Sequence, residues 1–328
     1  GHILRDAQNR PIAIATAASL AGTQLACTYR GATAARTYGK LFPSLNASSN
    51  VRENLIGRFS CAKSIARPNF NLILPGANVP DETSATRSIT LTNPALKPWI
   101  ADSFGVSLEY YFNQPSDGVV SARWFYRDIQ DFWGSITQPI TADLVDYYGL
   151  DPDVYGPDRG YTVTTSRNVG AAHIMGTEFE YRQNLNFLPE RFRGFNVFAN
   201  MTLQNLSGNP EANFTGFIEK TINYGVAFSR SQFTARVNVN MRGREKLALF
   251  TGAGVEPGTY NYRAPNTFVD CHLEFRITKN IAVYGTGRNL LNDYKLQERF
   301  GPSAPAYARL RSAEDTRRQF TLGVRGTF

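Results

Sequence analysis

Histidines and neighbouring carboxylates are the first side chains of this sequence that could bind a metal ion or transfer a proton. His272 stands between Asp270 and Glu274 at alternate positions, so an extended strand would place all three on one face. A metal site needs several ligands that converge on one point. The other histidines, His2 and His173, are far away in the sequence. We therefore interpret His272 as a polar residue on the wet face of a strand and predict no metal site.

Nucleophilic and redox chemistry is also poorly supported. The three cysteines, Cys27, Cys61 and Cys271, are an odd number without CxxC spacing, which argues against zinc and thioredoxin-type sites. One disulfide is chemically feasible, but its pairing does not follow from the sequence. The chain lacks GxSxG, HExxH and P-loop motifs, and the Gly-x-Gly in "YGTGRN" has no βαβ context. The sequence therefore predicts no enzyme and no cofactor.

Aromatic residues in one long predicted loop are the best candidates for ligand contact. The loop "QDFWGSITQPITADLVDYYGLDPDVYGPDRGY" is acidic and rich in Tyr and Trp, which pair an apolar ring with a polar tip. Such rings suit stacking on a sugar, a metal chelate or a peptide. The alternative is that they pack the loop against its neighbours. The candidates for substrate contact are Trp133, Tyr147, Tyr148 and Tyr155.

The elements that must position these residues are β-strands, because apolar residues alternate with polar ones throughout the chain. The stretch "FGVSLEYYF" places Phe104, Val106 and Leu108 on one face and Ser107 and Glu109 on the other. The same alternation predicts strands near residues 104–112, 119–129, 173–187, 194–205, 220–229, 232–242, 266–277, 281–290 and 317–328, and less clearly near 11–19, 23–31, 39–48 and 51–65.

The connections between these strands alternate in length. "NQPSDG", "LPERFRG", "SRS" and "TKN" are short, whereas residues 66–103, 130–172, 206–219, 243–265 and 291–316 form long links. Twelve residues at ~3.3 Å each, tilted by ~45°, rise roughly 28 Å, which is close to the apolar band of a transmembrane barrel. We predict an all-β fold, an antiparallel transmembrane β-barrel segment of about 12–13 strands. A secreted β-sandwich or β-solenoid remains the alternative.

Five stretches resemble the C-terminal part of TonB-dependent outer-membrane receptors. They are "SIARPNFNLILPG", "NPALKPWIADSFGVSLEYYF", "NVGAAHIMGTEFEY", "GRNLLNDY" and the terminal "QFTLGVRGTF". Their order and spacing span roughly residues 38–328. Family members often have Glu where this chain has Trp99.

The resemblance implies a 22-strand barrel in the bacterial outer membrane, of which residues 1–328 form the C-terminal portion, without the plug domain and first strands. It also implies that the last strand is the signal for the outer-membrane assembly machinery. The apolar residues of that signal are Phe320, Leu322, Val324 and Phe328. We expect residues 1–328 alone to aggregate or to fail to insert, because an open sheet leaves unpaired strand edges in lipid.

The expected function is active uptake of a scarce substrate bound at extracellular loops. The resemblance implies an iron-siderophore, another chelate or an oligosaccharide as the substrate and TonB, acting through the plug, as the energy source. A passive porin-like channel and a soluble secreted binding domain are the alternatives. A second loop begins with Arg242, Arg244 and Lys246, which would suit either a ligand or the anionic outer leaflet.

Bulk composition agrees with a folded outer-membrane protein that does not bind nucleic acid. The 328 residues are 42% hydrophobic and 19% charged, which argues against disorder. The formal charge is +8, but the cations are scattered and form no continuous basic stripe. The sequence contains no run of 18 apolar residues, so it predicts no transmembrane helix.

Overall fold

A computed structural model shows that the chain is almost entirely antiparallel β-structure, as the alternation predicts. The structure describes residues 4–5, 11–12, 39–74, 77–80, 87–112, 117–147, 150–209, 214–250, 255–256 and 258–327. The strands of the main sheet are β3 (Ser44–Arg52), β4 (Leu55–Ala66), β7 (Trp99–Phe112), β8 (Gly118–Pro139), β9 (Thr162–Asn184), β10 (Phe195–Gly208), β11 (Lys220–Arg230), β12 (Phe233–Arg242), β15 (Asn266–Arg276), β16 (Ile281–Arg288) and β19 (Gln319–Gly326).

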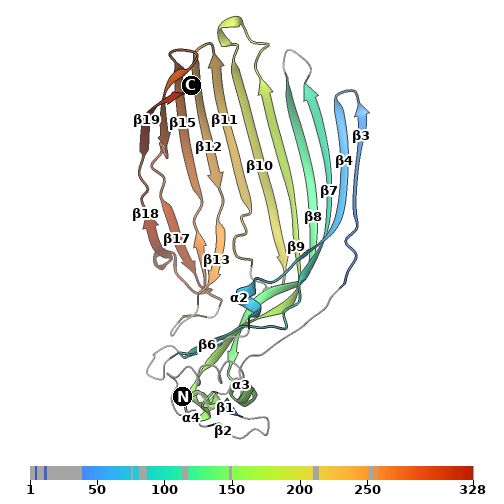
Figure 1. Ribbon diagram of the computed structural model, residues 1–328, viewed down its shortest axis with the longest axis vertical. Helices are drawn as coiled ribbons and strands as arrows, with labels where there is room; N and C mark the ends of the chain where they lie inside the picture. Colours follow the sequence, from blue (N-terminus) through green and yellow to red (C-terminus); the bar gives the residue numbers. More distant parts are fainter. Residues whose placement is uncertain are drawn as a thin grey trace.

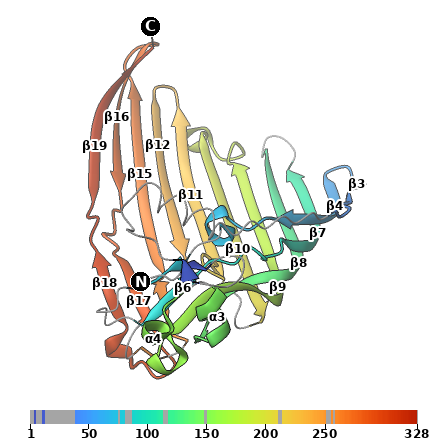
Figure 2. The same ribbon diagram turned by 60° about the horizontal axis from the view of Figure 1, so that its bottom comes forward.

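These strands lie side by side in one curved sheet (Figures 1 and 2). The order is β19-β16-β15-β12-β11-β10-β9-β8-β7-β4-β3, so strands that follow one another in the sequence are neighbours in space. The sheet is a partial barrel: within the described residues, β3 and β19 are the two ends of the order and do not meet. All neighbouring pairs along this path are antiparallel.

The short and long connections gather at opposite ends of the sheet. The short links are β3–β4, β7–β8, β9–β10, β11–β12 and β15–β16, and they lie with the chain's C-terminus at the upper end of Figure 1. We call this the turn end. The long links lie at the lower end, the loop end. The predicted alternation of short and long links is therefore confirmed.

Apolar side chains of the strands point away from the concave side and do not converge on a shared core. Val237 is 40% exposed, Leu273 50% and Phe320 71%. The opposite face bears ion pairs, such as the Arg58 guanidinium 2.8 Å from the Glu109 carboxylate across β4 and β7. An exposed apolar face backed by a charged face is what a barrel wall between lipid and water requires. It is the reverse of a β-sandwich, whose apolar faces are buried against each other.

Strands β8 and β9 extend further than the sequence analysis placed them. The link predicted at residues 130–172 is mostly strand, because β8 continues to Pro139 and β9 starts at Thr162. A register shift between Ile129 and Phe132, with Asp131 at φ 57°, marks where the two strands leave the barrel wall. The link itself, between Pro139 and Thr162, contains α3 (Ala142–Tyr147), α4 (Pro152–Tyr155) and a 3₁₀ turn, η1 (Pro157–Arg159).

We call this extension, residues 130–170, the excursion. It holds the larger of the two buried apolar clusters found in the described residues. Strand β6 (Ser88–Leu91), from the predicted long link at 66–103, runs parallel to the start of β9 and completes the cluster. That link also contains α2 (Phe70–Ile73) and β5 (Ala77–Asn78), which pairs with β6. The cluster consists of Ile89, Leu91, Ile140, Val145, Leu150, Tyr155, Tyr161 and Val163.

A second, four-stranded sheet stands at the loop end where the sequence analysis expected only long links at 243–265 and 291–316. We call it the loop-end sheet. It consists of β13 (Glu245–Leu249), β14 (Tyr260–Arg263), β17 (Lys295–Phe300) and β18 (Leu310–Glu314) in that order. A 3₁₀ turn, η3 (Ala306–Ala308), precedes β18. Each strand continues a barrel strand after a break of a few residues.

The strand predicted at 23–31 lies outside the described residues, as does most of the one at 11–19. Only β1 (Leu4–Arg5) and β2 (Pro11–Ile12) are described in this region, and they pair with each other. A further 3₁₀ turn, η2 (Glu190–Phe192), lies in a short link. None of the helices in the described ranges is long and apolar enough to span a membrane.

Candidate functional site

The predicted ligand-contact aromatics lie on the excursion but differ in what they can reach. The ring of Tyr155 is only 6% exposed, and its hydroxyl donates to the Pro80 carbonyl oxygen at 3.0 Å. It packs against Tyr161 with ring centroids 5.1 Å apart. Tyr155 therefore packs the excursion, which is the alternative that the sequence left open. The side chain of Tyr147 and all of Tyr148 lie outside the described residues.

Trp133 is half-buried at the base of the excursion. Its indole Nε1 donates to the Lys97 carbonyl oxygen at 2.8 Å, and its ring meets Trp99 edge-on at 6.4 Å. Part of the ring stays accessible, so ligand contact by Trp133 remains a prediction. The indole hydrogen bond fixes the orientation of the ring.

Asn168 joins two of the stretches that were singled out in the sequence. Its side chain accepts from the Lys97 N–H at 2.9 Å and donates to the Lys97 carbonyl at 3.0 Å and the Asp131 carbonyl at 2.6 Å. It thereby fastens the "NPALKPW" segment to the bulge at which the excursion begins. Two residues later, Gly170 has φ 119°, a conformation that residues with a Cβ avoid. The Asn-x-Gly spacing thus positions the excursion.

The concave face of the barrel sheet is lined by paired charges. The Glu109 carboxylate accepts from the Arg58 guanidinium and from the Tyr111 hydroxyl at 2.8 Å. Arg123 and Glu178 form a second ion pair at 3.4 Å. These groups border a hollow of about 580 Å³. The pairs make this wall polar, but their charges are mutually compensated.

A second hollow, of about 640 Å³, lies between the barrel strands and the concave face of the loop-end sheet. Glu245 is buried there and forms ion pairs with Arg242, at 2.7 Å, and with Arg263. Lys295 lies 3.4 Å from Glu314 on the same wall. The lining includes the cations Arg242, Arg263 and Lys295, one carboxylate, Glu314, and the amides Asn223, Asn240, Asn266 and Gln297.

One donor beside this second hollow is enclosed by protein and has no partner within the described residues. The Nε of Arg242 is buried and makes no hydrogen bond within the described residues. Buried guanidinium donors are normally satisfied, since each unmet donor costs about 1–3 kcal/mol. The cations and amides on its lining make this hollow suited to an anionic ligand.

His272 lies on the concave face as predicted, between β12 and β16. Its imidazole Nε2 is 3.8 Å from Glu274, which is itself bound by Arg325 at 2.7 Å, and the His272 ring stacks on Tyr284. Asp270 accepts from the Asn289 N–H at 2.9 Å. These carboxylates are engaged with other groups. In the described ranges, no three His, Cys, Asp or Glu side chains are grouped as metal ligands, and Cys61 and Cys271 are free thiols.

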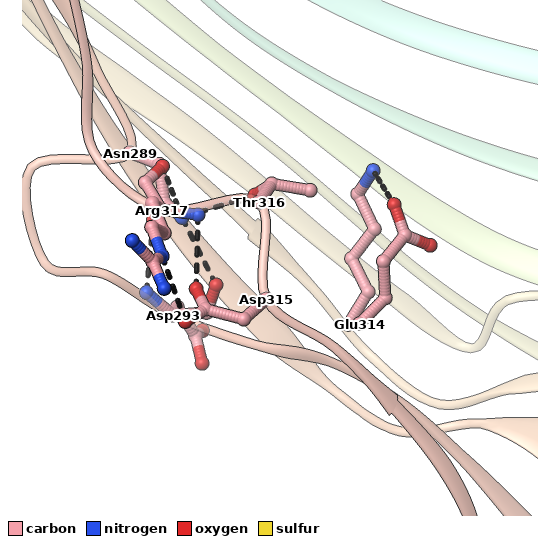
Figure 3. Close-up of polar contacts among 7 residues, drawn as sticks. Asn289, Asp293, Glu314, Asp315, Thr316 and Arg317 are labelled. Atoms are coloured by element: carbon pink, nitrogen blue, oxygen red, sulfur yellow. Dashed lines mark hydrogen bonds and ion pairs between the residues drawn. The ribbon is translucent and has the colours of Figure 1, made fainter.

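Asn289 holds the loop-end sheet to the barrel, a role that the sequence analysis did not identify. It is 5% exposed and has φ 51°. Its side-chain amide donates to the Asp293 carbonyl at 3.0 Å, to the Thr316 hydroxyl at 3.3 Å and to the Arg317 carbonyl at 3.4 Å. Figure 3 shows these residues close together in the two short connections that join β16 to β17 and β18 to β19. Asn289 is the first asparagine of the "GRNLLNDY" stretch, so this motif is the feature of the sequence that could have pointed to it.

The terminal residues of the predicted assembly signal lie on β19 at one end of the strand order. Phe320, Leu322 and Val324 are exposed on the apolar face of the sheet, and Phe328 lies outside the described residues. Their recognition by the assembly machinery remains a prediction.

Comparison with solved structures finds the fold of this sheet in several receptors, at low sequence identity. One is the ferric enterobactin receptor PfeA from Pseudomonas aeruginosa in complex with enterobactin, with 16% identity and a TM-score of 0.59 over 87% of this chain and 40% of that one. Another is the ferric-catecholate import receptor Fiu from E. coli, with 16% identity and a TM-score of 0.55 over 87% of this chain and 34% of that one.

The siderophore receptor PirA from Acinetobacter baumannii is also similar, with 16% identity and a TM-score of 0.53 over 77% of this chain and 37% of that one. The chain thus spans at most 40% of the length of these three receptors. None of the curated proteins matches its sequence.

The family model described as "TonB dependent receptor-like, beta-barrel" matches residues 17–290. The match covers most of the strands of the partial barrel and reaches Asn289 and the start of the last long link. The chain therefore belongs to the TonB-dependent receptor-like β-barrel family, and its strands form part of a barrel in the bacterial outer membrane.

Proposed function

We propose that this chain forms part of the barrel wall of a receptor that binds an anionic metal chelate, of the iron-siderophore class, at its extracellular loop end. The observation that supports this best is the hollow under the loop-end sheet, with Arg242, Arg263 and Lys295 on its lining. Guanidinium groups bind carboxylate and catecholate oxygens through paired N–H donors. The chemistry of the hollow therefore favours an anion over a neutral sugar.

The similar receptors point to the same ligand class. PfeA was solved with enterobactin, and Fiu is described as a ferric-catecholate import receptor. At 16% identity these structures show the fold, and their ligands only suggest which class of ligand to test first. Trp133 of the excursion, whose ring is half-buried, is proposed to contact the ligand as well.

Import by this receptor is proposed to use energy supplied by TonB, which the family name implies. A passive porin-like channel is the competing function. The two differ in their energy requirement, since a passive channel conducts in cells whose proton gradient has been collapsed. Uptake of a radiolabelled iron chelate with and without a protonophore separates them.

The binding proposal is tested by measuring uptake of a panel of iron chelates in cells that carry Arg242→Gln or Arg263→Gln. Each single change leaves Glu245 one remaining guanidinium partner. Loss of one charge-assisted hydrogen bond to the ligand weakens binding by about tenfold, so we expect the concentration for half-maximal uptake to rise by about that factor. Lys279→Gln, in a short link at the turn end, makes the same change of charge and is the control.

Unaltered half-maximal concentrations for every anionic chelate in both variants would contradict the proposal. So would uptake of a neutral oligosaccharide that competes fully with the chelates. Trp133→Ala is measured alongside, because a ligand contact at that ring raises the half-maximal concentration, whereas a purely structural ring changes only the amount of protein in the membrane.

A further inference from the structure

The convex face of the loop-end sheet has three cations resting on three aromatic rings. The Lys246 ammonium lies 3.8 Å from the centroid of Tyr260. The Arg244 guanidinium lies 4.5 Å from the centroid of Phe300 and 5.9 Å from that of Tyr262. The Arg309 guanidinium lies 4.6 Å from the same Phe300 ring. We call this group of six residues the outer patch.

The outer patch faces away from the barrel interior, as strand alternation shows. Glu245 and Arg263 are cross-strand partners on the concave side, where Glu245 forms ion pairs with both Arg242 and Arg263. The next pair along the same strands, Lys246 and Tyr262, must then lie on the opposite side. Tyr260 is two residues from Tyr262 and is the cross-strand partner of Phe300, so these rings share that side.

The outer patch begins where the apolar face of the barrel ends. On β12 the exposed apolar residues are Phe233, Val237 and Met241, and Arg244 and Lys246 follow within five residues of Met241. At ~3.3 Å per residue the patch starts within roughly 10–16 Å of the last apolar side chain. That interval matches the polar headgroup layer, which adds roughly 5–8 Å on each side of a bilayer's hydrocarbon core, once strand tilt is allowed for.

The charges of the outer patch are incompletely neutralised. Arg244 lies 3.5 Å from Glu298, which faces the same side, and Glu219 is the other carboxylate close to Tyr262. Lys246 has no ion pair within the described residues, and burial lowers its pKa below the ordinary 10.5. The guanidinium of Arg309 has one hydrogen bond to the part of the chain that the structure describes, from Nε to the Ala304 carbonyl oxygen at 3.3 Å. The patch therefore has cationic donors to offer to an anion outside the barrel.

We propose that the outer patch binds phosphate groups of the phosphorylated glycolipid of the outer leaflet. Arg and Lys donors suit phosphate oxygens, and Tyr rings at a membrane interface pack against the apolar and sugar portions of a lipid. The aromatic rings beneath the cations hold them at the headgroup level and keep them from folding back into the hollow. The patch is separate from the second hollow, the proposed ligand site, which lies on the other face of the same sheet.

The test measures lipid bound to the protein after purification in neutral detergent from its native outer membrane. Native mass spectrometry counts the bound glycolipid in the wild-type protein and in the triple variant Arg244→Gln, Lys246→Gln, Arg309→Gln. The protein is then titrated with the bisphosphorylated lipid core and with the same core after removal of both phosphates. Lys279→Gln, which removes one cation at the turn end, is the control for loss of charge outside the patch.

We expect the triple variant to bind the phosphorylated lipid at least about tenfold more weakly, because it loses more than one charge-assisted hydrogen bond. The control should bind as the wild type does, and removal of the phosphates from the lipid should weaken wild-type binding as much as the variant does. Inorganic phosphate at the same concentration should not compete, since it lacks the acyl chains that lie on the apolar face.

Three results overturn the proposal. The first is equal binding of phosphorylated and dephosphorylated lipid by the wild type, which would mean acyl-chain contact alone. The second is full competition by inorganic phosphate, which would mean a site for soluble anions. The third is unchanged lipid binding by the triple variant. If the triple variant fails to fold, as judged by heat-modifiable gel migration, the wild-type protein still tests the proposal. Weaker binding of the dephosphorylated lipid would support it, and equal binding of the two lipids would overturn it.

Discussion

At the scale of single residues, Asn289 shows how one side chain determines where a strand stops. Its backbone has φ 51°, in the left-handed region that Asn tolerates better than most residues. Its buried amide donates to three oxygens from both breaks between the barrel and the loop-end sheet. Backbone conformation and hydrogen bonding therefore both require Asn at this position, and substitution can separate the two requirements.

We predict that Asn289→Gly destabilises the protein by about 1–3 kcal/mol, the cost of leaving buried partners unsatisfied, while keeping the backbone conformation accessible. Asn289→Ala should cost more, since it also strains the backbone. The measurement is thermal unfolding in detergent, followed by the loss of heat-modifiable gel migration. Asn280→Gly, in an exposed turn, is the control. Equal stability of Asn289→Gly and wild type would show that only the backbone conformation matters.

The residues chosen from the sequence as ligand contacts illustrate what side-chain type alone cannot reveal. In the sequence, Tyr155 and Trp133 are equally good candidates for ligand contact, because each has an aromatic ring with a polar group. In the fold, the hydroxyl of Tyr155 binds Pro80, which lies 75 residues earlier, and its ring is enclosed. Whether an aromatic ring packs a loop or faces a ligand depends on such distant contacts, and periodicity within the loop does not encode them.

At the scale of elements, the excursion is a small structure with its own core. Ile89 on β6 and Val163 on β9 are cross-strand partners, and both are fully buried. The barrel strands beside it have one face exposed and gain no comparable core. The excursion should therefore unfold independently of the barrel.

We predict that Ile89→Ala loosens the excursion by about 2–5 kcal/mol, because it removes buried methyl groups and leaves a cavity. Limited proteolysis with mass mapping should show faster cleavage within residues 140–161, while heat-modifiable migration of the barrel stays unchanged. Leu74→Ala, at an exposed position, should have neither effect. Parallel loss of barrel migration and excursion integrity would show that the two form one cooperative unit.

The barrel strands were predictable and the loop-end sheet was not, for one physical reason. Strands between lipid and water have strong contrast between their faces, as in Phe104, Val106 and Leu108 against Ser107 and Glu109. In β14, "YNYR", both faces lie in water or at a headgroup layer, so Tyr260 and Tyr262 alternate with Asn261 and Arg263 without a clear hydropathy signal. For the same reason the predicted end of β8, at residue 129, came too early, and the predicted start of β9, at residue 173, came too late.

At the scale of the whole molecule, the described sheet is a wall with two free ends. β19 pairs with β16 and β3 pairs with β4, and within the described residues neither has a second neighbour. Unpaired strand edges are not tolerated in hydrocarbon. A membrane-embedded form must therefore provide partners for both edges. The loop-end sheet, the excursion and the hollow proposed to bind the ligand all stand at one end of this wall, away from the membrane-spanning part.

The central claim is that alternate residues of these strands contact two different solvents. It is tested most directly by introducing single cysteines along β12, from Phe233 to Arg242, in a background with the native cysteines replaced by serine. Each variant, inserted in the outer membrane, is treated with a water-soluble thiol reagent and with a lipid-soluble one. The account predicts a period of two: Phe233, Val237 and Met241 positions react with the lipid-soluble reagent, and Thr234, Arg236 and Asn238 positions with the water-soluble one. Uniform protection of the apolar positions from both reagents would mean that they are buried inside the protein and would contradict the account.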